Sequence, residues 1–152
     1  MAAVLKEEEI NLIDYSWEVL STSPQSMMRF YDHLFAIAPE TRHFFPDDIS
    51  KQSEKLAYTI GFIVGNLERL ETIKNAIEDI GRFHNKLQIE AYHYTNLKIA
   101  LVKTIEENME EKYHEDIGKA WYSALDYVSN LMLNAATKKQ GRFVRFTSKL
   151  FH

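Results

Sequence analysis

The stretch from residue 73 to residue 94 reads IKNAIEDIGRFHNKLQIEAYHY, and it is the part of the chain that decides the fold class. Apolar residues and one histidine recur in it at steps of three and four residues, the spacing of one helix face: Ile73, Ile77, Ile80 and His84. We therefore predict a helix from about Ile73 to Leu87. A histidine on an apolar helix face is more often a core residue than a ligand, so the rest of the chain must decide its role.

The same helical periodicity continues on both sides of this stretch. Ile10 to Leu20 form one apolar stripe, and Ser23 before Pro24 predicts a helix start with an oxygen cap. Further helices are predicted from Lys51 to Leu67, from Tyr94 to Met109 and from Ile117 to Met132. No segment alternates with period two for long enough to indicate a strand. The sequence thus predicts an all-α domain of six or more helices.

Composition limits the function further. A chain of 152 residues is expected to form one domain, and its lack of cysteine excludes disulfide scaffolds, thiol catalysis and thiolate metal sites. A formal net charge of −4 argues against general nucleic-acid binding. We see neither an apolar run of the roughly 20 residues that a membrane span needs nor a secretory signal, so we expect a cytoplasmic protein without a transmembrane segment.

Several segments, taken in order, carry a family resemblance. They are FYDHLF at 30–35, PETRHFF at 39–45, QSEKLA at 52–57, IGRFH at 80–84, Ile89, the pair His93-Tyr94 and the pair Ala120-Trp121. Over about residues 5–136 this set resembles the globins, specifically single-domain bacterial haemoglobins and the haem domain of flavohaemoglobins. The resemblance implies a globin fold, a three-on-three helical sandwich around haem b. We expect a globin domain at 1–137 and a tail at 138–152.

The resemblance also assigns a proximal side of the haem. His84 matches the axial iron ligand, and a ligating imidazole needs an acceptor for its other N–H, for which main-chain carbonyls near Ile80 and Gly81 are expected. Phe45 matches the corner phenylalanine that packs on the porphyrin, or Phe44 if the register differs by one. The remaining cofactor contacts that we expect are Leu56, Ile80, Ile89, Tyr94 and Leu97, with Lys55 or Lys51 beside a haem propionate.

On the distal side, Tyr31 and Gln52 match the positions that reach a bound gas molecule. A phenol O–H and an amide N–H can each donate a hydrogen bond to it, which would slow the release of oxygen. Leu56 is expected to form the apolar wall above the iron. Both polar residues also have a plainer interpretation, Tyr31 as a core tyrosine and Gln52 as a surface residue.

The chain departs from the flavohaemoglobin pattern in its last helix and after the proximal helix. A glutamate that joins the tyrosine and the proximal histidine in that family would fall near Ala136, where this chain has no acid. We therefore expect less electron donation to the iron, which argues against peroxidase-like or fast dioxygenase chemistry. Gln88-Ile89 replaces a Gly-Val pair, and a local shift is expected there. His33 and His43 flank the distal side, while His93, His114 and His152 are predicted to lie at the surface.

These features favour reversible binding of oxygen and other diatomic gases for storage, delivery or scavenging. One alternative is a nitric oxide dioxygenase that depends on a separate reductase, since none is expected in 152 residues. Another is a gas sensor acting through the tail, and a third is a globin-like domain without haem. The tail holds five basic residues and no acid. It is interpreted either as a loosely packed segment or as a weak membrane-surface or partner contact.

Overall fold

The computed structural model describes residues 4–137, so the basic tail at 138–152 lies outside the described residues. The described part consists of six α-helices and three short 3-10 segments, with no strand between residues 4 and 137. The α-helices are α1 (Glu7–Ser21), α2 (Pro24–Ile37), α3 (Ser50–Val64), α4 (Lys74–Lys86), α5 (Ala91–Met109) and α6 (Glu115–Ala136). The 3-10 segments are η1 (Pro39–Phe44), η2 (Leu67–Ile73) and η3 (Glu110–Lys112). The predicted all-α class is confirmed for residues 4–137.

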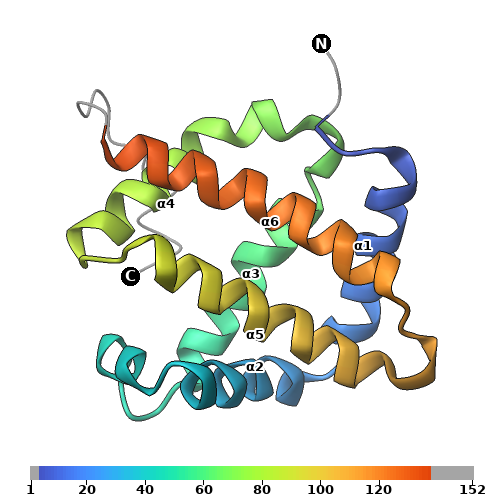
Figure 1. Cartoon of the computed structure of the whole chain (residues 1–152), viewed down its shortest axis with the longest axis horizontal. Coiled ribbons are helices and arrows are strands. Elements are labelled where there is room, and N and C mark those ends of the chain that lie inside the picture. Colours follow the sequence, from blue (N-terminus) through green and yellow to red (C-terminus); the bar gives the residue numbers. More distant parts are fainter. Residues whose placement is uncertain (1–3, 138–152) are drawn as a thin grey trace.

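Two layers of helices enclose the core. Figure 1 shows α5 and α6 running across the front of the molecule, with α3 behind them and α2 along the lower edge. The closest helix pairs are α4 with α6 and α2 with α5. The side chains of α2, α3, α4, α5 and α6 line a common space between these helices.

Within residues 4–137, no helix combines the length and hydrophobicity needed to cross a bilayer.

Two local features hold α6 in place. Trp121 is buried, and its indole N–H donates to Ser16 Oγ at 2.7 Å, which links α6 to α1. Gly81 of α4 packs directly on α6, because a Cβ atom added there would lie 2.4 Å from Met132 Cα and from Met132 O. Only a residue without a side chain permits this approach of α4 to α6.

Two details of the predicted helices were wrong. Leu67 does not continue α3, which ends at Val64, but begins the 3-10 segment η2. Ser23 does precede Pro24 at the start of α2, yet its hydroxyl donates to Gln25 Oε1 at 3.1 Å and does not cap the helix. At Leu67 the side chain stays buried although the α-helix has ended. At Ser23 a local side-chain contact takes the place of the expected cap.

Candidate functional site

The helices surround a cavity made of two connected chambers. The outer chamber has a volume of about 270 Å³ and opens between α4, the start of α5 and the η1 corner. The inner chamber has a volume of about 160 Å³ and extends between α3, α5 and α6. Six side chains line both chambers: Leu34, Phe45, Gln52, His84, Tyr94 and Leu97. A ligand that reaches from one chamber into the other therefore passes His84.

His84 lies near the end of α4 with its ring toward this cavity. Its Nδ1 atom lies 3.1 Å from the hydroxyl oxygen of Tyr94 on α5. Burial lowers the pKa of His84 to about 4 and raises that of the Tyr94 hydroxyl to about 12, so both groups are neutral near pH 7. The sequence analysis predicted main-chain carbonyls near Ile80 and Gly81 beside this nitrogen, and the structure shows the Tyr94 hydroxyl as one partner of it. A neutral imidazole with a hydrogen-bonded Nδ1 is a suitable metal donor.

The turn after α4 fixes where His84 lies. Gln88 has a left-handed backbone with φ 66°, a conformation that usually requires glycine. The Ile89 N–H donates to His84 O at 3.0 Å, and the Gln88 N–H donates to Asn85 O at 2.9 Å. These two bonds form a Schellman motif, which closes the end of α4. The backbone at Gln88 thus adopts a conformation that favours glycine, and Ile89 lines the outer chamber.

The opposite wall carries Tyr31 and Gln52. Tyr31 on α2 is buried, lines the inner chamber and places its hydroxyl 3.5 Å from the main-chain oxygen of Gln52. Burial raises the pKa of the Tyr31 hydroxyl well above its usual range, so it keeps its proton at neutral pH. Gln52 lies in the first turn of α3 and lines both chambers. Two hydrogen-bond donors thus face the same apolar space from neighbouring helices.

Aromatic packing holds this wall. The Phe45 ring contacts the rings of Tyr31 and Phe35, with centroid separations of 5.4 and 5.6 Å, and it lines both chambers. Phe44, the alternative in the sequence analysis, lines only the outer chamber and packs against His93 at 5.2 Å. The position of Phe45 at the junction of the chambers fits the register used for the sequence assignment.

The cavity brings together every predicted cofactor contact. Leu56, Ile80, Leu97 and Lys55 line the inner chamber, and Ile89 lines the outer one. Lys51, the second candidate for a propionate partner, is exposed and lies outside both linings. No carboxylate is among the described residues that line either chamber, and Ala136 is not part of the lining.

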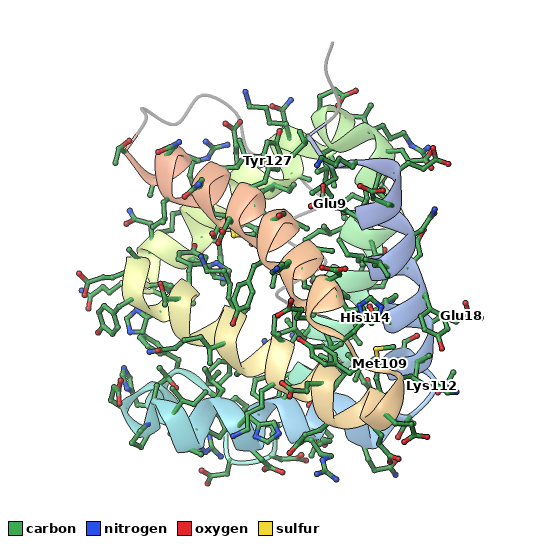
Figure 2. The ribbon with its side chains drawn as sticks, turned by 45° about the vertical axis from the view of Figure 1, so that its right-hand side comes forward. Glu9, Glu18, Met109, Lys112, His114 and Tyr127 are labelled. Carbon is green, nitrogen blue, oxygen red and sulfur yellow. The ribbon has the colours of Figure 1, made fainter. Side chains whose placement is uncertain are left out.

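One histidine that was predicted to lie at the surface lines the cavity. His93, predicted to be a surface residue, lines the outer chamber, and its Nδ1 accepts the main-chain N–H of Glu90 at 2.8 Å. The three-residue spacing of Glu90 and His93 at the start of a helix is the sequence feature that could have predicted this capping contact. His33 binds Glu107 with its Nε2 atom at 2.6 Å, outside the cavity lining. His114 is exposed, and Figure 2 shows it near Met109 and Lys112, where α5 connects to α6.

The chemistry of the cavity fits a flat and mostly apolar cofactor that carries a metal. Most of its lining is aliphatic or aromatic, and its combined size falls in the range of pockets for small ligands and cofactors. One imidazole faces both chambers, which suits a metal that receives its other ligands from a macrocycle. Residues His84, Tyr94, Phe45 and Leu97 are placed to contact such a group.

Comparison with known proteins gives a consistent result. A family model described as Globin matches residues 28–132. An uncharacterised globin-like protein of Aquifex aeolicus is 30% identical over 136 residues, covering 89% of this chain and 96% of its own length. An anaerobic nitrite reductase of Brassica napus is 26% identical, covering 90% of this chain and 94% of its own length. A flavohaemoprotein of Vibrio cholerae is 24% identical over 86% of this chain, which spans only 34% of that protein.

Proposed function

The chain belongs to the globin family, and from that premise we propose that it is a haem b protein that binds oxygen reversibly for storage, delivery or scavenging. Haem-based binding of diatomic gases in general follows from the family. The type of haem, the residues that hold it and the physiological role are the proposal. The observation that carries it is the position of His84, which lines both chambers with its Nδ1 beside Tyr94.

In this proposal His84 is the proximal ligand. The haem supplies the iron atom to which a gas molecule binds. In this assignment the His84 Nδ1–H donates to Tyr94 Oη, which fixes the tautomer in which Nε2 is the atom that binds the metal. Because Tyr94 is a neutral acceptor and the described lining holds no carboxylate, the imidazole keeps little anionic character. This weak electron donation favours reversible binding over cleavage of an oxygen–oxygen bond.

The apolar lining and one cation hold the cofactor. Phe45, Leu97 and Ile89 contact the ring system and exclude water, together with Leu56 and Ile80. The Lys55 ammonium, on the same helix as Gln52, binds a propionate carboxylate.

Tyr31 and Gln52 hold the gas. The protonated phenol of Tyr31 and the side-chain amide of Gln52 each donate a hydrogen bond to a ligand that gains partial negative charge. The contact between the Tyr31 hydroxyl and Gln52 O is long, at 3.5 Å, and is therefore a weak hydrogen bond that a bound ligand can replace. The expected result is slow release of oxygen.

Nitrite reduction is the second candidate, because this chain matches 94% of the length of a relative that is named an anaerobic nitrite reductase. Nitric oxide dioxygenation is the other enzymatic alternative. Both activities need an external electron donor, in contrast to reversible oxygen binding. The predicted cytoplasmic location stays a prediction.

Optical spectra of the purified protein test the proposal. We expect a Soret band, a five-coordinate ferrous form and an oxygenated form that persists and reverts when oxygen is removed. Absence of a Soret band after haem supplementation would contradict every haem-based function. Sustained nitric oxide consumption with a reductase, or steady anaerobic conversion of nitrite to nitric oxide, would instead make the enzymatic alternative the main function.

A further inference from the structure

Lys98 of α5 is one of two charged residues among those described in the lining of the inner chamber, and it is paired with a residue of α6. Its ammonium binds Asp126 Oδ1 of α6 at 2.7 Å. The Asp126 side chain is 56% exposed and the Lys98 side chain only 17%, so the carboxylate end of the ion pair lies at the molecular surface while the Lys98 chain lines the chamber. A single side chain therefore reaches from the inner chamber to solvent at this point.

The neighbouring residues of this wall are more deeply buried than Lys98. Leu101 follows Lys98 by one turn on α5 and is fully buried, and Val128 and Ser129 of α6 are buried as well. Leu125, one residue before Asp126, is only half-buried and also lines the chamber. Lys98 and Leu125 are thus the less buried residues of this wall, at the place where the ion pair bridges the two helices.

The other charged residue of the inner chamber comes from a different helix. Lys55 lies on α3, one turn after Gln52, and Figure 1 shows α3 behind the α5 and α6 layer. The two lysines therefore line the same chamber from different helices. A molecule crossing the α5–α6 wall would enter the chamber without passing Gln52.

We propose that the Lys98–Asp126 pair is the gate of a ligand access route between α5 and α6, used by small uncharged diatomic molecules. An ion pair at the protein surface contributes at most about 1 kcal/mol, and the exposed Asp126 side chain changes rotamer within nanoseconds. When the pair opens, the aliphatic chain of Lys98 moves away and leaves apolar chamber wall facing outward. The route serves the gas site proposed above, and so rests on that function, but the gate itself is a property of the chain.

Removing the Lys98 side chain tests the gate. In the haem-loaded protein we expect Lys98→Ala to raise the bimolecular rate of carbon monoxide rebinding after flash photolysis about two- to fivefold and to lower the geminate fraction. Lys98→Trp should do the opposite by filling the opening. Lys119→Ala is the matched control, because Lys119 pairs with Glu115 on the exposed face of α6 at 3.7 Å.

A second measurement does not depend on iron. Xenon-129 NMR of the same variants should show faster exchange of xenon from the cavity in Lys98→Ala than in the wild type or in Lys119→Ala. Unchanged exchange and unchanged rebinding in both Lys98 variants would overturn the gate, as would an equal effect of Lys119→Ala. A protein without a Soret band that still shows the xenon effect would refute the proposed function and leave the gate standing.

Discussion

On the α4 side of the cavity, His84 Nδ1 lies 3.1 Å from Tyr94 Oη, whereas on the α2–α3 side the hydrogen bond from the Tyr31 hydroxyl to Gln52 O is longer, at 3.5 Å. The α4 side is also fixed by its backbone, because Gly81 contacts Met132 and the Schellman motif at Gln88 closes the helix. The α2–α3 side is held mainly by aromatic packing around Phe45.

This difference suits two different tasks. A metal ligand has to be held in one position and one tautomer before the cofactor arrives, since reorientation would weaken its bond. Groups that stabilise a transient gas ligand need only lie within reach and have protons to donate. We therefore expect mutations on the α4 side to affect cofactor binding and stability, and mutations on the α2–α3 side to affect the kinetics of gas release.

The largest effect is expected from His84→Ala. Removing the imidazole leaves the cavity lining intact but takes away the proposed axial ligand, so stable haem binding should be lost. The measurement is the Soret absorbance after gel filtration of haem-supplemented protein, and added imidazole should restore part of it. His114→Ala, at an exposed position outside the cavity, should retain full haem content. Full retention of haem in His84→Ala would overturn the proximal assignment.

Tyr31→Phe tests the other wall. The substitution removes one hydrogen-bond donor and keeps the ring that packs on Phe45, so haem content should not change. Loss of a donor costs about 1–3 kcal/mol, which corresponds to oxygen dissociation about 5- to 150-fold faster. Stopped-flow displacement of oxygen by carbon monoxide measures this rate, and Tyr58→Phe, at an exposed position on α3, is the control. An unchanged rate would mean that Tyr31 does not contact the gas.

Gly81→Ala probes the backbone contact that fixes the α4 wall. An added Cβ would lie 2.4 Å from main-chain atoms of Met132, so α4 must move away from α6. We expect a loss of about 1–3 kcal/mol in the free energy of unfolding, measured by urea denaturation, together with weaker haem retention. Gly61→Ala is the matched control, because its Cβ would meet Trp17 at an ordinary 3.7 Å. That variant should be neutral or gain about 0.5–1 kcal/mol.

Helix periodicity was sufficient to predict most of the fold. Apolar residues three and four positions apart located α1, α2, α4, α5 and α6, because each helix buries one continuous face. The end of α3 could not be found this way, since Leu67 continues the apolar pattern and stays buried although the backbone changes to a 3-10 segment. A pattern of burial records which side chains face the core, not how the backbone between them is wound.

The same limit applies to predicting the site from the sequence. Spacing and resemblance identified His84, Tyr31 and Gln52, and the structure places all three at one cavity. The resemblance also linked Tyr94 to His84 through a hydrogen-bonded set that includes a glutamate, but it did not predict the direct contact of the Tyr94 hydroxyl with His84 Nδ1, which joins two helices. His93 and Lys98 were missed for a related reason. Whether a polar side chain faces a cavity depends on how its helix is rotated by packing.

Gln88→Gly is expected to have the smallest effect, and it tests whether the α4 side is limited by backbone strain. Gln88 holds φ 66°, and a left-handed conformation costs a residue with a Cβ about 1–2 kcal/mol that glycine avoids. Glycine also gains freedom in the unfolded chain, which offsets about 0.5–1 kcal/mol of this benefit. We therefore expect a net gain of about 0.5–1 kcal/mol in the free energy of unfolding, measured by urea denaturation.

Haem content and the oxygen dissociation rate should stay as in the wild type, because the hydrogen bonds of the Schellman motif involve only main-chain atoms. Glu110→Gly, at the other left-handed residue and away from the cavity, should give a similar gain. A loss of stability at Gln88 alone would show that its side chain, rather than the backbone turn, fixes the end of α4 and with it His84.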